Sequence, residues 1–291
     1  MKLKHNIVLV YINDWCLLFI IAIIFISSCN SPRYIYSASP PNYPIFTEKG
    51  QSKFAAYYSA TPGNSITEKL AEGLDLQGAF ALSNHWAVTG SIYKRREKDF
   101  YKEGGFAKPF KSSEVKYKRN VVELGAGYFA SVNPPNTITI NFYAGAAAGK
   151  FSIIDDGVDI NNVNYNREYN SDKKKFFFQP ALNFIPNPNF NVSLIFKSSY
   201  VHYTNNRTSY TADELRTFQL DLIDNKTLNF IEPAINVEFG FAKYPWIKLG
   251  ALISGVANQP LHRDNVRNSN SSVGLTFDFS KLKKTQPAKI E

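Results

Sequence analysis

Basic residues gather at three places in the sequence, and each place adjoins a stretch that we expect to be a loop. Lysine and arginine side chains close to one another attract phosphate and other anionic groups. The sequence therefore predicts a basic collar that binds anionic groups, formed by Lys94, Arg95, Arg96, Lys116, Lys118, Arg119, Lys173, Lys174 and Lys175. The alternative is a solvated rim whose charges are partly neutralised by nearby acidic residues, among them Glu97, Asp99 and Glu114.

A second group of charged residues is spread over segments in which apolar and polar side chains alternate. Asp75, Glu123, Lys197, Glu232 and Glu238 all fall on the polar side of that alternation. Lys197 and Glu232 lie on consecutive segments, so their side chains can stand opposite one another and form an ion pair. We interpret the five as structural charges in a narrow lumen. A path for protons or ions is the alternative.

Catalytic chemistry has few candidate residues in this chain. His202 has Ser198 and Ser199 nearby, a combination that occurs in hydrolases and proteases. The aspartates that can approach it from loops are Asp155, Asp156 and Asp213. Their spacing matches no catalytic motif, and no two histidines or cysteines have the spacing of metal ligands. The sequence therefore predicts a protein that is not an enzyme and holds no metal or cofactor.

Ten segments in which apolar and polar side chains alternate must position these residues. The connections between the segments are alternately short and long. The expected strands are 51–59, 73–82, 86–96, 116–132, 137–152, 174–184, 190–202, 228–241, 246–257 and 271–280. Tight turns lie at 83–85 and 133–136, for example, whereas the loops 97–115 and 153–173 are long. An even strand number with this alternation is typical of an outer-membrane barrel with short periplasmic turns. We therefore expect an all-β fold, an antiparallel up-and-down β-barrel.

The two faces of each expected strand differ in composition. One face is apolar, and the other is rich in Ala, Gly, Ser, Thr and Asn, with few of the Lys and Glu residues of a water-exposed surface. A soluble barrel buries its apolar face, whereas a membrane barrel turns that face towards lipid and fills its lumen with small and polar side chains. The composition favours a membrane barrel over a soluble, lipid-tethered barrel or sandwich.

One long loop, 203–227, has helix signals. Thr211 followed by Glu214 is a capping-box pattern, which predicts a short helix within 212–220. The loop then forms either a lid over the mouth of the barrel or a packed surface loop.

The amino terminus resembles the signal peptide of a bacterial lipoprotein. Lys2 and Lys4 precede the apolar run 17–26, and Ser27 and Ser28 precede Cys29, which would be acylated after cleavage. The run is too short to span a bilayer as a helix. We therefore expect a signal peptide at 1–28, a Pro-rich tether at 29–49, a barrel domain at 50–281 and a polar tail at 282–291. Loss of Cys16 and acylation of Cys29 leave the mature chain without a free thiol.

Several segments resemble those of an uncharacterised family of outer-membrane-β-barrel-like lipoproteins found in Bacteroidota. They are Tyr34 to Pro41, Asn42 to Gly50, His85 to Val88, Lys118 to Gly125 and Ser209 to Leu215. The resemblance implies an outer-membrane barrel and carries no activity. Residues 30–33, Asn-Ser-Pro-Arg, lack the acidic run that directs some such lipoproteins to the outer face, so a lipid on the periplasmic side is expected.

The sequence as a whole predicts a lipid-anchored outer-membrane protein with a structural or binding role in the envelope. The net charge of the chain is +9, which in an exported protein favours anionic lipid over nucleic acid as a partner. At the height of the lipid A phosphates in an outer membrane, the basic collar is expected to bind lipopolysaccharide. Protein partners are not predicted. The alternatives are a soluble periplasmic lipoprotein that binds a lipid or small molecule, a narrow channel, and a lipid-modifying enzyme.

Overall fold

The computed structural model describes residues 33–60, 70–102, 110–224, 226–258, 265–267 and 269–284. Cys29, the expected signal peptide and residues 285–291 of the expected tail lie outside these ranges. No helix in the described part of the chain is long and apolar enough to cross a membrane.

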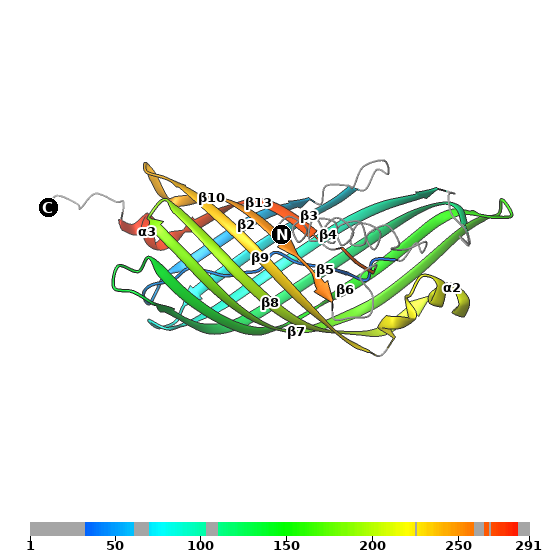
Figure 1. The fold of residues 1–291 in the computed structure, drawn as a ribbon, viewed down its shortest axis with the longest axis horizontal. Coiled ribbons are helices and arrows are strands. Elements are labelled where there is room, and N and C mark those ends of the chain that lie inside the picture. The colour runs from blue at the N-terminus through cyan, green and yellow to red at the C-terminus, as the bar shows by residue number, and fades with distance from the viewer. Residues whose placement is uncertain are drawn as a thin grey trace, which may run out of the picture.

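Among the described residues, ten antiparallel strands close into a barrel, which confirms the predicted fold class (Figure 1). They are β2 (Ser52–Ala60), β3 (Leu70–Ala81), β4 (Trp86–Lys102), β5 (Phe110–Ser131), β6 (Ile138–Asp159), β7 (Asn164–Asn187), β8 (Phe190–Thr208), β9 (Thr227–Phe241), β10 (Tyr244–Gly255) and β13 (Ser269–Asp278). Each strand pairs with the next along the chain, and β13 closes the ring on β2, with Gly274 opposite Tyr57. Closure gives every barrel strand a partner on both sides, which leaves no open sheet edge.

Smaller elements complete the structure. They are β1 (Tyr36–Ser37), β11 (Ala257–Asn258), β12 (Val266–Arg267), α2 (Ala212–Thr217), the 3-10 helix η1 (Asp221–Ile223) and α3 (Phe279–Lys284). The predicted capping box is present at α2, because the Thr211 hydroxyl accepts from the Glu214 N–H and the Glu214 carboxylate accepts from the Thr211 N–H.

Two of the predicted long loops are in fact largely strand. β4 and β5 continue to Lys102 and Phe110, and β6 and β7 continue to Asp159 and Asn164, so the strands take up much of 97–115 and 153–173. In these extensions the outward face of each strand is polar instead of apolar. Their composition therefore resembled that of loops. The inward alternation continues, however, with Val115 and Ile153 fully buried. One wall of the barrel therefore rises well above the rest.

Apolar side chains face outward in a continuous band around the barrel. Leu124, Phe176 and Ile253 are about two thirds exposed, at 67%, 67% and 66%. The lumen instead buries polar side chains such as Thr139, Asn183 and Ser193, each fully enclosed. This is the arrangement of a membrane-spanning barrel and the reverse of a soluble one, whose apolar face would form the core.

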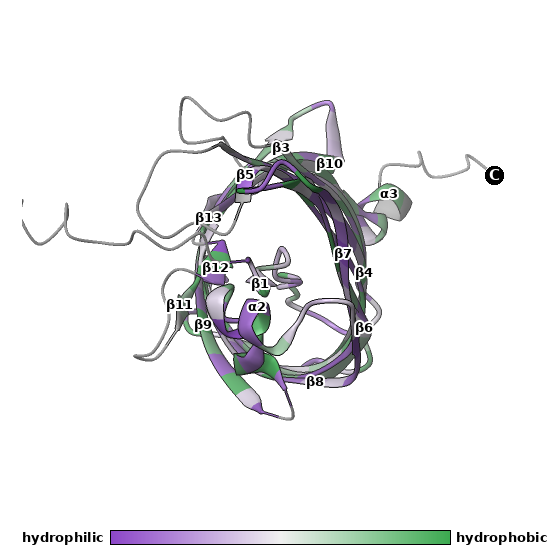
Figure 2. Ribbon diagram, turned by 90° about the vertical axis from the view of Figure 1, so that its right-hand side faces the viewer, coloured by the Kyte–Doolittle hydropathy of each residue, from purple (hydrophilic) through white to green (hydrophobic). Residues whose placement is uncertain are grey.

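The segment expected to be a tether runs through the inside of the barrel instead. Figure 2 shows the barrel end-on, with β1 and β12 inside its outline. We call residues 33–47 the luminal segment; all of them are buried or half-buried except Thr47. The segment is extended, as its prolines predict. A tether was expected because four prolines in twenty residues cannot form a central strand, but such a chain also fits a narrow lumen, where side chains of the wall supply its hydrogen bonds.

The contacts of the luminal segment give its direction. Arg33 contacts Asp155, near the long-loop end of β6, and Tyr36 donates to Glu232 on β9. Farther along, Pro44 O accepts from Asn141, and Phe46 packs on Phe129 close to a short turn. The segment therefore enters at the long-loop mouth and leaves at the turn end, where Lys49 N–H donates to Asn84 and β2 begins.

Close approach of β5 and β6 depends on glycine. Gly125 and Gly145 are paired in register, and a Cβ atom on Gly145 would lie 2.2 Å from Leu124 O and 2.7 Å from Cζ of the Phe177 ring. The Phe177 ring occupies the space that the two glycines leave in the lumen.

Replacing Gly145 with Val is expected to prevent closure of the barrel, because the added atoms overlap backbone that has no room to move. The measurement is the fraction that migrates as compact barrel in an unheated detergent gel, which should fall to near zero. Ala146→Val, one residue along and facing outward, is the control and should retain the wild-type fraction. A normal folded fraction for Gly145→Val would contradict this account of the packing.

Candidate functional site

The centre of the lumen is organised around one carboxylate. Glu123 forms ion pairs with Lys175 and with Lys197, whose Nζ lies 2.7 Å from Oε2, and the three side chains are at most 5% exposed. Ser39 of the luminal segment donates to Oε1 of the same carboxylate at 3.2 Å. One wall residue therefore holds two strands and the luminal segment together.

The ion pair expected between Lys197 and Glu232 is not formed, although the two residues do lie directly opposite in register on β8 and β9. Lys197 reaches across the lumen to Glu123 instead. Glu232 accepts from the hydroxyls of Tyr36 and Ser199. The sequence therefore predicted that the two residues lie near one another, whereas the choice of partner depends on residues brought together from across the barrel.

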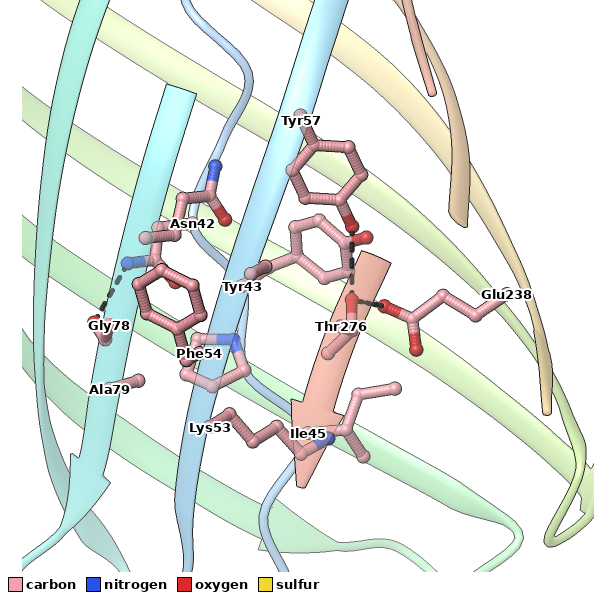
Figure 3. Close-up of a pocket in the computed structure, with 13 residues that line it drawn as sticks. Asn42, Tyr43, Ile45, Lys53, Phe54, Tyr57, Gly78, Ala79, Glu238 and Thr276 are labelled. Atoms are coloured by element: carbon pink, nitrogen blue, oxygen red, sulfur yellow. Dashed lines mark hydrogen bonds between the residues drawn. The ribbon is translucent and has the colours of Figure 1, made fainter. Parts of the chain in front are cut away.

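The other two predicted lumen charges also face inward. Asp75 is fully buried and accepts from Gln77 Nε2 at 2.6 Å. Glu238 accepts from Asn191 and from Thr276, and Thr276 in turn contacts the Tyr57 hydroxyl (Figure 3). The structure thus places all five predicted lumen charges inside the barrel.

A second charge network lies above the apolar band. Glu97 contacts Arg95, Arg119 and Arg267, and Arg267 also donates two hydrogen bonds to Asp99 at 2.9 Å. Despite burial, which acts in the opposite direction, the three guanidinium groups lower the pKa of Glu97 to about 2. Arg119 also donates to Tyr34 O at 2.6 Å, so this network too is attached to the luminal segment.

The mouth of the barrel is filled by the first residue of the luminal segment and the folded loop. The Arg33 guanidinium pairs with Asp155 at 2.6 Å and lies 4.1 Å from the Phe218 ring centroid. Tyr210 donates to the same carboxylate at 3.0 Å, and burial, followed by that negative charge, raises the pKa of the Tyr210 hydroxyl. The segment that carries α2 therefore covers the mouth, where Figure 2 also shows α2.

The described part of the lumen contains one small cavity beside the luminal segment. A cavity of about 30 Å³ lies between the luminal segment and β2, lined by residues that include Tyr43, Tyr57 and Glu238 (Figure 3). A volume of this size holds one or two water molecules. It is too small for a lipid or for a drug-sized ligand.

The nine predicted collar residues divide between two faces of the barrel wall. Arg95, Arg119, Lys173 and Lys175 point into the lumen and are at most 6% exposed. Lys94, Arg96, Lys118 and Lys174 are exposed on the outer surface, while Lys116 is partly exposed and pairs with Glu114 and Asp156. Successive side chains of a strand point to opposite faces, so neighbours such as Arg95 and Arg96 must lie on different sides of the wall. This alternation could have separated the inward from the outward collar residues at the sequence level.

The outward basic residues lie just above the apolar band. Arg96 and Lys118 are paired in register on β4 and β5, and Lys94 and Lys150 each stand opposite Asn120. None of these four basic side chains forms an ion pair with another described residue. Two depressions of about 440 and 380 Å³ flank Lys118. The first is lined by Lys150, Arg207 and the acidic Asp172, and the second by Lys94, Arg96 and the acidic Glu72. Lys150 and Arg207 were missed at the sequence level because each is isolated there.

The residues of the hydrolase alternative are not brought together. His202 faces outward and contacts the Thr227 hydroxyl at 3.4 Å, whereas Ser199 faces the lumen and donates to Glu232. Ser198 lies on the outer side of β8 and Asp155 lies in the mouth, bound to Arg33. Within the described ranges, no group of three or more His, Cys, Asp and Glu residues is placed to hold a metal ion.

No family model matches this chain, and no curated protein matches it. Several solved structures are similar in fold. Ail, the attachment invasion locus protein of Yersinia pestis, is 15% identical with a TM-score of 0.30, covering 79% of this chain and 99% of that one. The outer membrane protease OmpT of Escherichia coli is 11% identical with a TM-score of 0.41, covering 79% and 94%. An outer membrane channel of Pseudomonas putida F1 is 9% identical with a TM-score of 0.38, covering 82% and 100%. None of them assigns an activity to this chain.

Replacing Glu123 with Gln should destabilise the barrel, because Lys175 and Lys197 would then be buried close together without the carboxylate that pairs with both of them. Loss of one partner of a buried pair typically costs about 3–5 kcal/mol. The measurement is the midpoint of urea unfolding in detergent micelles, followed by tryptophan fluorescence. Glu72→Gln removes an exposed carboxylate from β3 and serves as the control. Equal midpoints for the two variants would show that Glu123 does not hold the lumen together.

Proposed function

We propose that this protein is an outer-membrane β-barrel lipoprotein with a structural and lipid-binding role, anchored by a lipid on Cys29 and bound to lipopolysaccharide through its outward basic residues. The observation that carries the lipopolysaccharide proposal is the pairing of Arg96 with Lys118 on the outer surface. Like charges directly opposite on neighbouring strands destabilise a sheet. Glu72 on β3 stands on the other side of Arg96 and offsets part of that repulsion. A bound anion would offset the rest.

The position of these residues suggests which anion it is. They stand immediately above the apolar band, where Leu74 on β3 is opposite Lys94 on β4. In an outer membrane whose short turns face the periplasm, this is the level of the lipid A phosphates. A lysine or arginine bound to phosphate makes a charge-assisted hydrogen bond. The binding subset is therefore Lys94, Arg96, Lys118 and Lys174 of the predicted collar, together with Lys150 and Arg207.

The filled lumen supports a structural or binding role over transport. The luminal segment, the two charge networks and the covering loop occupy the interior, and the cavity beside Tyr43 is only about 30 Å³. A barrel that conducts small solutes would need a continuous aqueous path through these groups.

The lipopolysaccharide proposal is tested with the double variant Arg96→Gln/Lys118→Gln. The amount of lipid A that co-purifies with each barrel, measured by mass spectrometry, should fall about tenfold, because two charge-assisted hydrogen bonds to phosphate are lost. Lys49→Gln/Lys243→Gln removes the same charge from exposed residues at the turn end and should leave the lipid A content unchanged. Equal losses in the two variants, or no loss in the first, would count against the proposal.

Anchoring is tested by comparing the wild type with Cys29→Ala in cells fed radioactive palmitate. The wild type should be labelled and the variant should not. Both should stay in the membrane after carbonate washing, because the outward apolar band holds the barrel in the bilayer without the lipid. An unlabelled wild type would refute lipidation. A Cys29→Ala variant that washes off as soluble protein would refute the membrane-spanning barrel.

A further inference from the structure

The luminal segment crosses the whole barrel in one direction. Its carboxyl end continues into β2 at the short-turn end, and its contacts climb past Phe129, Asn141 and Glu123 to Asp155 near the opposite rim. We infer that the amino-terminal end of the chain leaves the barrel at the long-loop mouth, and that a lipid on Cys29 lies in the leaflet around that mouth, facing the cell exterior. The leaflet assignment rests on the proposed lipidation and on the proposed outer-membrane orientation.

The position of Arg33 limits where Cys29 can be. Arg33 is fully buried, paired with Asp155 and covered by the Phe218 ring, so it is fixed at the mouth. Four residues of fully extended chain reach roughly 14 Å. The apolar band alone is about 25 Å tall, and Arg33 lies above it, so Cys29 cannot return to the turn end. A lipid on the periplasmic side was expected because ten strands put the start of the first strand at the turn end. β2 does start there. The residues that precede it, however, were expected to lie outside the barrel, whereas 33–47 run through the lumen.

The same geometry constrains assembly. The lumen around the segment is filled, with Tyr36 stacked on Phe230 at 3.8 Å between ring centroids and Glu123 in contact with Ser39. A diacylated amino terminus is much larger than the cavity of about 30 Å³ that lies between the luminal segment and β2. The strands must therefore close around the segment, because the lipidated end cannot be drawn through a finished barrel. Once closed, the barrel and its lipid cannot separate without unfolding.

Cysteine labelling of intact cells tests this topology. Acylation of Cys29 leaves the mature wild type without a thiol, so each added cysteine reports on one position. A membrane-impermeant maleimide should label Ser31→Cys on intact cells as fully as it labels Asn161→Cys, in the tight turn between β6 and β7. Asn189→Cys, in the turn between β7 and β8, should be labelled only after the cells are broken. A second variant carries a hydrophilic epitope inserted after Asn30 and should bind antibody on intact cells. The epitope is needed because the covering loop could hide a single cysteine side chain from the maleimide.

The outcomes separate the topology from the lipidation. If Ser31→Cys and the epitope are both protected on intact cells, as Asn189→Cys is, the segment does not end at the outer mouth and the inference is wrong. Labelling of Asn189→Cys with protection of Asn161→Cys would reverse the barrel and also overturn it. If the wild type itself reacts with maleimide after denaturation, Cys29 is not acylated. In that case the proposed lipidation fails, while labelling of the Ser31 position in a Cys29→Ser background still reports where the segment ends.

Discussion

The charges that a narrow membrane barrel buries in its lumen must be neutralised there, and Glu123 is the residue through which this protein does so. Its carboxylate is buried against two lysines from β7 and β8 and accepts from the luminal segment. Charges this far from water are costly unless they are paired and hydrogen-bonded. The arrangement therefore ties the packing of the lumen to the position of the segment inside it.

The luminal segment works as an internal ligand of the barrel. Its backbone cannot form a regular ladder, because Pro40, Pro41 and Pro44 lack N–H groups, yet its carbonyl oxygens still need donors. The wall supplies them from side chains: Gln77 donates to Pro40 O and Pro41 O, and Asn141 donates to Pro44 O. Near the mouth the segment is the donor instead, because its Arg33 guanidinium donates to the Asp155 carboxylate of the wall. Polar residues that looked like the lining of a hydrated pore are thus partners for the chain that fills it.

The two faces of one strand divide the basic residues between two roles. On β4, Arg95 turns inward to Glu97, whereas Lys94 and Arg96 turn outward above the apolar band. The inward group stabilises the rim of the lumen by charge pairing. Lys94 and Arg96 form no ion pair within the described ranges, although Glu72 on β3 stands opposite Arg96. The sequence showed three basic clusters, but it did not separate these roles.

The sequence by itself determined the strands, their order and the short turns, because alternation and turn residues are local signals. It also indicated that Lys197 and Glu232 can lie at similar heights, because they fall on consecutive strands. Only the tertiary structure decided that Lys197 pairs with Glu123, that residues 33–47 lie in the lumen and that β4 to β7 continue above the band. Each of these depends on what stands across the barrel, and contacts between residues far apart in the chain leave no periodic trace in a single sequence.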